Sequence, residues 1–163
     1  MLARSIQRLA VVGRRGFAAA APAKNTNPEE LRLTFASPDT ALFNNAAVKQ
    51  VDVPTLAGMV GVLANHVPTI GVLKPGVVQV TTNEGTVQRI FVSSGTLSVN
   101  IDGSCQVLAE EVLKVEDIDE SAARNELESA QRASGEGSEV NKAEAQIRVE
   151  VAEALIKAVT NQQ

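Results

Sequence analysis

One alternating run, Thr96-Leu97-Ser98-Val99-Asn100-Ile101-Asp102-Gly103, sets the architecture expected for this chain. Leu97, Val99 and Ile101 alternate with polar residues, which is the period of a strand with one buried face. Asp102-Gly103 then predicts a tight hairpin, because glycine adopts positive φ without steric cost. A weaker strand signal follows at 105–109. The sequence therefore predicts a β-hairpin with Ile101 on its buried side.

Similar signals on either side extend this hairpin into a larger β domain. Residues 31–36 alternate equally cleanly, beginning at Leu31. Asn83-Glu84-Gly85 predicts another hairpin, and Lys74-Pro75-Gly76-Val77 fits a type II turn with proline second and glycine third. Many short strands separated by such turns are typical of an antiparallel β-sandwich or barrel, which we place over 31–115. Weaker strand signals cover 48–53, 77–82 and 86–93.

From residue 116 onward the period becomes helical, which predicts an antiparallel two-helix hairpin over 116–163. Asp117 with Glu120 predicts the start of the first helix, which runs to about Ala133. A Gly- and Ser-rich break follows at 134–138, and the second helix runs from about Glu139 to Thr160. The faces expected to pack together are narrow, so the hairpin needs a third surface, either the sandwich or a partner chain. These faces comprise Ala123, Leu127 and Ala130 in the first helix, and Ala143, Ile147, Val151, Ala154, Leu155 and Ala158 in the second.

The N-terminal residues 1–17 have the character of a mitochondrial transit peptide. They carry four arginines and no acid, with apolar residues at helical spacing, and the first acid of the chain is Glu29. We expect cleavage near Phe17, followed by a flexible lead-in at 18–30; the alternative is a basic arm of the folded protein. Cleavage would leave 11 basic against 19 acidic residues. Such an acidic protein is a poor partner for nucleic acid or anionic lipid.

No catalytic, metal or cofactor constellation can be assembled from this sequence. His66 is the only histidine, and we expect it to order the turn Asn65-His66-Val67-Pro68 or to contact a partner. Cys105 is alone and is expected in the core. A lysine-borne carrier domain is disfavoured because Lys74 is followed by Pro75. No phosphate-binding loop is formed by the glycines, which are expected in turns and bulges: Gly58, Gly61, Gly71 and Gly76.

A family resemblance is carried by the run Gly58-Met-Val-Gly-Val-Leu-Ala-Asn-His66-Val-Pro68-Thr-Ile-Gly-Val-Leu-Lys74-Pro75-Gly76. It strongly resembles the β-sandwich of the delta subunit family of mitochondrial F-type ATP synthases, the counterpart of bacterial and chloroplast epsilon subunits. The resemblance covers about 31–160. It continues in Phe91–Val99, in Val107–Glu110 with Ile118–Glu120, and in Ala143–Arg148.

This resemblance implies a non-catalytic rotor subunit without a cofactor. In the family, the subunit lies at the foot of the central stalk, on the matrix side of the mitochondrial inner membrane. It binds the gamma subunit and the small mitochondrial epsilon subunit, and rests on the c-ring. The residues that align with ring-facing loops are Met59, Asn65 and His66.

A regulatory or inhibitory nucleotide-sensing subunit on the same fold is the alternative. Bacterial relatives that bind ATP on the hairpin carry a motif of the type Ile/Leu-Asp-x-x-Arg-Ala. Ile118 and Asp119 match it, but Ala122 stands in the arginine position, and Arg124 points elsewhere around the helix. The resemblance therefore implies no functional ATP site and a hairpin that serves as a scaffold.

Overall fold

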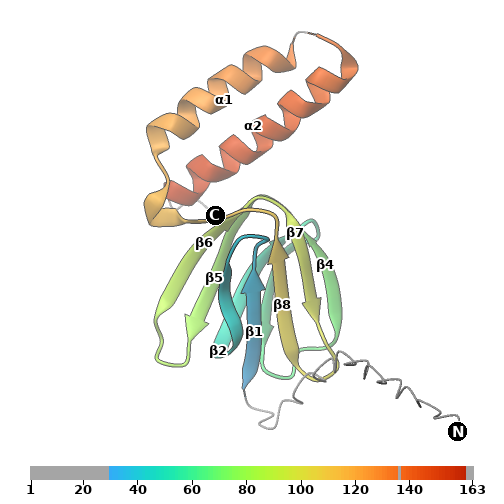
Figure 1. Ribbon diagram of the computed structural model, residues 1–163, viewed down its shortest axis with the longest axis vertical. Coiled ribbons are helices and arrows are strands. Elements are labelled where there is room, and N and C mark those ends of the chain that lie inside the picture. Colours follow the sequence, from blue (N-terminus) through green and yellow to red (C-terminus); the bar gives the residue numbers. More distant parts are fainter. Residues whose placement is uncertain (1–29, 136, 161–163) are drawn as a thin grey trace, which may run out of the picture.

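The structure, a computed structural model, describes residues 30–135 and 137–160 (Figure 1). A sandwich of β-strands carries a helical hairpin on one end, as the sequence predicts, and β1 begins at the opposite end. The predicted transit peptide and residues 18–29 of the predicted lead-in lie outside the described residues. The strands are β1 (Leu31–Ala36), β2 (Ala41–Thr55), β3 (Gly58–Leu63), β4 (Thr69–Leu73), β5 (Gly76–Thr82), β6 (Val87–Val92), β7 (Gly95–Val99), β8 (Ser104–Ala109) and β9 (Val112–Lys114).

The long strand β2 joins the two layers of the sandwich. It pairs antiparallel with β1 through its first half, and with β3 and β5 through its second half. The strand order is β1-β8-β7-β4-β2-β5-β6-β9, with β3 added on β2. The pairing is antiparallel except between β1 and β8, which run parallel. The predicted antiparallel sandwich is therefore confirmed with one parallel pair.

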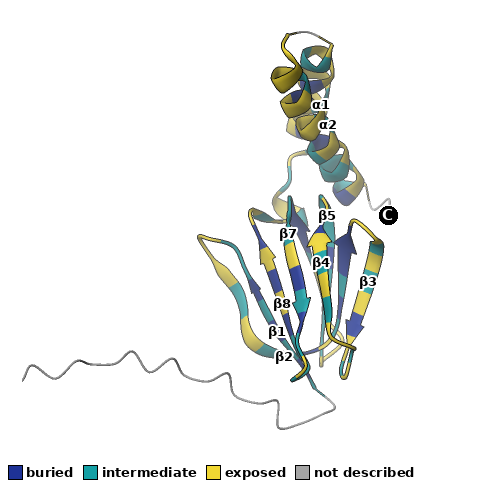
Figure 2. Cartoon of the chain, turned by 90° about the vertical axis from the view of Figure 1, so that its right-hand side faces the viewer, coloured by how far each residue is buried: buried dark blue, intermediate teal, exposed yellow. Residues whose placement is uncertain are grey.

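The core between the layers is built almost entirely from aliphatic side chains. Along β1 and β8 alternate residues point inward, as the period of two predicts (Figure 2). Cys105 is buried among them, as expected. The cluster comprises Leu31, Leu33, Phe35, Val48, Val51, Val53, Val62, Leu73, Val78, Val80, Ile90, Val92, Leu97, Val99, Cys105, Val107 and Ala109.

The predicted hairpin at Asp102-Gly103 is present, but the prediction for Ile101 was wrong. β7 ends at Val99, and Asn100 closes the turn by donating its N–H to the Ser104 carbonyl at 2.8 Å. Gly103 has φ of 79°, as a tight turn requires. Ile101 therefore sits in the turn, where the strand period no longer applies, and its side chain is 93% exposed.

The glycine-rich stretch after residue 57 was also misread. Gly61 and Gly71 lie inside β3 and β4, two strands that the sequence did not predict. Gly76 begins β5 and is not among the glycines with positive φ, so the predicted type II turn is absent. The position is tight for a side chain, because a Cβ on Gly76 would lie 3.1 Å from Cβ of Pro54.

The helices are α1 (Glu120–Ser134) and α2 (Glu139–Val159), preceded by a 3-10 turn, η1 (Val115–Asp117). The first helix starts later than predicted. Its N-cap is Asp119, whose carboxylate accepts hydrogen bonds from the N–H groups of Ser121 and Ala122, whereas Asp117 belongs to η1. Ser138 caps α2 in the same way through the N–H of Asn141.

The face of α2 that packs on α1 differs from the predicted one. Ala123 and Ala130 of α1 are buried as expected. On α2 the buried residues are Ala145 and Ala152, which the prediction did not include, and Ala158, which it did, whereas the predicted Ala143 and Ile147 are exposed. α2 has two apolar stripes on opposite sides: Ala145 and Ala152 lie on one, and Ala154 and Ala158, which line the groove toward the sandwich, lie on the other.

Candidate partner-binding surfaces

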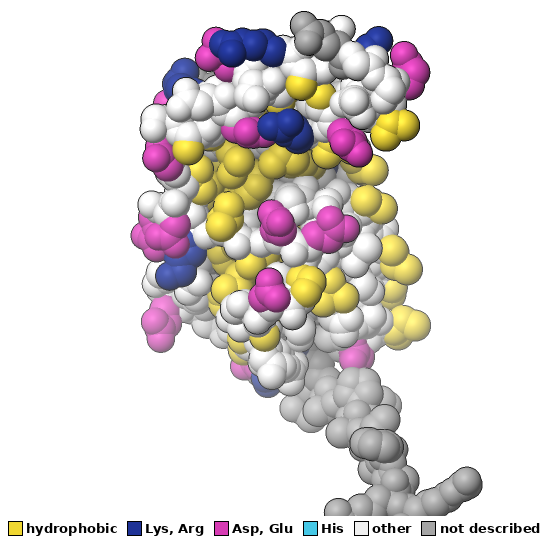
Figure 3. Space-filling view, turned by 45° about the horizontal axis from the view of Figure 1, so that its top comes forward, with side chains coloured by type: hydrophobic (Ala, Val, Ile, Leu, Met, Phe, Trp, Pro, Cys, Tyr) yellow, Lys and Arg dark blue, Asp and Glu magenta, His cyan; other side chains and the backbone are white. Residues whose placement is uncertain are grey.

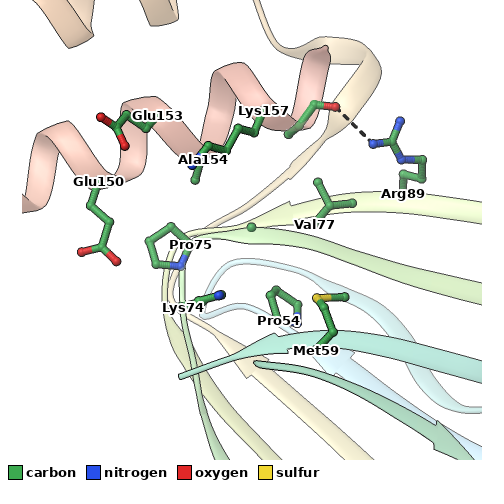
Figure 4. Close-up of a pocket in the computed structure, with 12 residues that line it drawn as sticks. Pro54, Met59, Lys74, Pro75, Val77, Arg89, Glu150, Glu153, Ala154 and Lys157 are labelled. Carbon is green, nitrogen blue, oxygen red and sulfur yellow. Dashed lines mark hydrogen bonds between the residues drawn. The ribbon is translucent and has the colours of Figure 1, made fainter. Parts of the chain in front are cut away.

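A groove separates the hairpin from the sandwich (Figures 3 and 4). Its sandwich wall is built from the β2–β3 and β4–β5 connections and their flanking strands, and its roof is the last two turns of α2. Figure 3 shows hydrophobic side chains gathered at this end of the molecule, with acidic and basic groups around them. The groove is lined by Pro54, Met59, Lys74, Pro75, Gly76, Val77, Arg89, Glu150, Glu153, Ala154, Lys157 and Ala158.

Arg89 joins the two walls of this groove. It lies on β6, and its Nη2 donates a hydrogen bond to the Ala158 carbonyl at 3.2 Å (Figure 4). That carbonyl belongs to the last turn of α2, where carbonyl groups lack partners within the helix and carry partial negative charge. The guanidinium therefore attaches the end of α2 to the sandwich.

The turn around His66 lies at the other end of β3. The Nδ1 of His66 is 2.8 Å from the Val67 carbonyl, and the His66 N–H donates to the Leu63 carbonyl at 3.2 Å. Asn65 adopts φ of 61°, in the left-handed region that asparagine tolerates. The His66 ring thus helps to order the turn, one of the two roles expected of it.

The three residues proposed from the sequence as ring contacts do not form one surface. Met59 is half-exposed at the start of β3, where it lines the groove beneath α2. Asn65 and His66 follow the end of the same six-residue strand. A strand of that length separates the two places by about 17–20 Å. The Asn65-His66 turn and Met59 are therefore candidates for contact with different partner surfaces.

The hairpin residues discussed as a nucleotide motif are engaged within the hairpin. The Asp119 carboxylate caps α1, and the hydrogen bond from the Ser121 hydroxyl at 2.7 Å is the main reason that the pKa of Asp119 is lowered. Arg124 pairs with Glu120 at 2.6 Å, one turn away. Arg148 of α2 pairs with Glu126 of α1, also at 2.6 Å.

Reactive chemistry is sparse in the part of the chain that the structure describes. Burial raises the pKa of the Cys105 thiol to about 12, so it is protonated and unreactive at physiological pH. Within 30–135 and 137–160, three or more His, Cys, Asp or Glu side chains nowhere gather as metal ligands would. In the same ranges, neither helix has the length and apolar character needed to cross a bilayer.

Comparison with known proteins explains this pattern of surfaces without reactive groups. The family described as "ATP synthase, Delta/Epsilon chain, beta-sandwich domain" matches residues 30–115. The chain is 87% identical to ATP synthase subunit delta, mitochondrial, of Caenorhabditis elegans over the full length of both chains. This chain belongs to the delta subunit family of mitochondrial ATP synthases. The Saccharomyces cerevisiae subunit delta is 37% identical over 88% of this chain and 87% of its own.

Solved structures support membership of this family through the fold. A chain of the Euglena gracilis mitochondrial ATP synthase, in a structure of OSCP, F1 and the c-ring, matches with a TM-score of 0.78 at 26% identity. The match covers 86% of this chain and 90% of that one. A chain from the central stalk and c-ring structure of Tetrahymena thermophila ATP synthase shares the fold, with a TM-score of 0.63 at 14% identity. That match covers 82% and 99% of the two chains.

Proposed function

We propose that this chain is a non-catalytic subunit of the central stalk of mitochondrial ATP synthase. It links the gamma subunit to the c-ring, so that proton-driven rotation is coupled to ATP synthesis, and it also binds the small mitochondrial epsilon subunit. The observation that carries the proposal is the 87% identity to a mitochondrial delta subunit along the whole of both chains. The related structures described as including a c-ring or central stalk support the same assignment.

The architecture suits a part that transmits torque. Such a part needs stiffness and matched surfaces rather than acid–base or nucleophilic groups. Here an aliphatic core fills the sandwich, and Arg89 fastens the hairpin to it. Several of the described basic side chains of the hairpin pair with its acids, as in Arg124–Glu120 and Arg148–Glu126. We therefore assign no catalytic residue to this subunit.

The N-terminal segment fits import into the organelle where this complex works. We propose that residues 1–17 are removed on entry to the matrix and that the mature chain associates peripherally with the inner membrane through the enzyme. N-terminal sequencing of the subunit purified from mitochondria tests this directly. A mature chain that still begins at Met1 would contradict it.

The test of the rotor assignment is purification of the enzyme from solubilised mitochondria through a tag on this chain. We expect the gamma, epsilon and c subunits to be recovered with it in constant proportion. A stable free monomer that never migrates with the enzyme would overturn the proposal.

A separate measurement distinguishes the scaffold role from nucleotide sensing. The purified chain is heated with and without millimolar ATP, and we expect the same unfolding temperature in both samples. A ligand at 100 times its Kd would add about 2.7 kcal/mol of stability, which a thermal scan readily detects. An ATP-dependent rise would favour a regulatory nucleotide sensor on this fold.

A further inference from the structure

The strand β3 forms an open edge of the sandwich. In the described part of the chain it pairs with β2 alone, over the whole of its length and without a bulge. Figure 2 shows β3 at one margin of the sandwich. An open edge can pair with a strand of another chain, and proteins usually prevent this with a charged side chain, a proline or a bulge on the edge strand. β3 has none of these three features.

The backbone groups that point to the open side follow from the pairing of β2. Pro54 of β2 has no N–H, and its carbonyl accepts from the Lys74 N–H at 3.2 Å, on the side of β2 away from β3. Met59 lies opposite Pro54, so the N–H and C=O of Met59 point away from β2. Because the direction alternates along an antiparallel pair, the same holds for Gly61 and Leu63. The open edge therefore presents an N–H and a C=O from each of these three residues.

The outer face of β3 is apolar. Met59 is 54% exposed and Leu63 50%. Gly61 lies between them, beside the Asp52 carboxylate of β2, whose oxygen would be 3.0 Å from a Cβ at position 61. Gln50 Nε2 donates a hydrogen bond to that carboxylate at 2.7 Å. β3 thus has a hydrophobic side chain at each end of its outer face and none in the middle.

The sequence of β3 is symmetric in character about Gly61. In either direction from Gly61 come a valine and then a large hydrophobic residue, as in Met59-Val60-Gly61-Val62-Leu63. A two-fold axis at Gly61 places this glycine opposite the same glycine of a second copy, and Met59 opposite Leu63 of that copy. The edge groups of one copy then meet those of the other. A contact between identical surfaces requires this self-complementarity.

We propose that two copies of this chain pair antiparallel through β3, with the two-fold axis at Gly61. Met59 of each copy packs beside Leu63 of the other on the outer face. The two Asp52 carboxylates lie three strand spacings apart, about 14 Å, where salt screens their repulsion. Five residues a side form a small interface, so the dimer dissociates on dilution. It is a state of the chain outside the enzyme, and it does not rest on the proposed function.

Sedimentation of the purified full chain at rising concentration tests the proposal. We expect a reversible equilibrium between monomer and dimer. Amide exchange gives a signature of the edge: the N–H groups of Met59, Gly61 and Leu63 should exchange more slowly as concentration rises, whereas those of Val60 and Val62, which point to β2, should change little. A chain that sediments as a monomer throughout overturns the proposal, and so does equal slowing at all five positions.

Paired charges test the register. In Met59→Lys/Leu63→Lys each lysine lies opposite a lysine of the other copy, and we expect the Kd of the dimer to rise about tenfold. In Met59→Glu/Leu63→Lys each glutamate lies opposite a lysine, so the Kd should stay well below that of the first variant and should rise in high salt. Equal weakening in the two variants overturns the antiparallel register, and a wild-type Kd in Met59→Lys/Leu63→Lys overturns the use of β3.

Leu108→Lys is the matched control. Leu108 is 49% exposed, almost the same as Leu63, but it lies on β8, which is paired on both sides, with β1 and with β7. A lysine there removes a similar apolar surface without changing an open edge, so the Kd should equal that of wild type. A rise as large as in Met59→Lys/Leu63→Lys overturns the proposal, because it would indicate general hydrophobic association. Circular dichroism of each variant confirms that it is folded.

Discussion

The sandwich and the hairpin are stabilised in different ways. The largest fully buried side chains, among them Phe35 and Leu33, all belong to the sandwich. The buried residues of α1 and α2 are alanines only. An alanine removes little apolar area from water, and isolated helices of this length are marginal in water. The sandwich therefore carries its own core, whereas the hairpin depends on what it rests against.

The largest expected effect comes from breaking the sandwich at Gly95. This residue has φ of 148°, and a Cβ there would lie 2.0 Å from the Leu108 carbonyl oxygen, which belongs to the paired strand β8. Neither backbone can move without parting β7 from β8. We expect Gly95→Ala to cost more than about 4 kcal/mol of unfolding free energy, or to prevent folding, as measured by urea denaturation.

Gly85→Ala is the control for the backbone angle. Gly85 also has positive φ, 86°, but nothing lies within 4 Å of a Cβ built there. Only the left-handed conformation is penalised, at about 1–2 kcal/mol. Equal losses for the two alanine variants would show that the close approach at Gly95 does not matter.

A smaller side chain in the sandwich core and a larger one between the two helices should destabilise the protein in different ways. Leu33→Ala leaves a cavity in the sandwich and should cost about 2–5 kcal/mol. Ala152→Leu forces the helices apart and should cost about 1–3 kcal/mol, with loss of helical rather than sheet signal. Circular dichroism during urea unfolding separates the two signals.

Ala143→Leu tests which face of α2 packs on α1. Ala143 is exposed, so leucine there should change stability by less than about 0.5 kcal/mol. If Ala143→Leu lowers the unfolding free energy as much as Ala152→Leu does, then the face of α2 expected from the sequence packs on α1, and the face seen in the structure does not.

A smaller effect is expected at the link between the two regions. Arg89→Ala removes the hydrogen bond to the Ala158 carbonyl, worth about 1 kcal/mol. Amide exchange in the last turn of α2 should then accelerate about fivefold, while exchange in β5 stays unchanged. Arg124→Ala, whose guanidinium pairs within α1, should leave the last turn of α2 as it is. Uniform acceleration over both regions would mean that Arg89 supports the sandwich rather than the link.

These contrasts show which parts of the structure were accessible from sequence. Strands with strict alternation, such as 31–36, and turns with Asn/Asp-Gly chemistry were predicted correctly because the signal is local. β3 and β4 were missed because Gly61 and Gly71 interrupt their strand signal, and in the folded chain both glycines lie beside side chains of neighbouring strands. A Cβ on Gly61 would lie 3.0 Å from the Asp52 carboxylate oxygen on β2. This contact depends on the neighbouring strand, so the residue pattern of β3 alone does not indicate it.

Only some residues of the candidate surfaces could be predicted from the sequence. The turn at Asn65-His66 could be placed from the resemblance to the delta family, but its neighbour Ile101 was assigned to a buried strand because the alternation continues into the turn. Arg89, on β6, carried no signal at all, because its partner is a backbone carbonyl 69 residues away. The second helix has two apolar stripes, and sequence periodicity cannot decide which of them meets α1.

The smallest expected difference between the sandwich and the hairpin is in how pH changes the stabilisation that one aspartate contributes to each. Asp119 caps α1 and Asp102 orders the β7–β8 turn, and in both cases a serine hydroxyl is the main cause that lowers the carboxyl pKa below 3.8. A lowered folded-state pKa means that stabilisation is present above the unfolded pKa and is lost as pH falls through the folded pKa. We therefore expect each contribution to fade only below about pH 4.

Asparagine variants test this expectation. Asparagine keeps the accepting oxygen but has no titrating group, so the stabilities of wild type and variant should converge in acid. For Asp119→Asn the converging signal should be helical ellipticity, and for Asp102→Asn it should be amide exchange in β7 and β8. Convergence of both signals in both variants would show that hairpin and sandwich unfold as one unit, and that their difference in core packing has no energetic consequence.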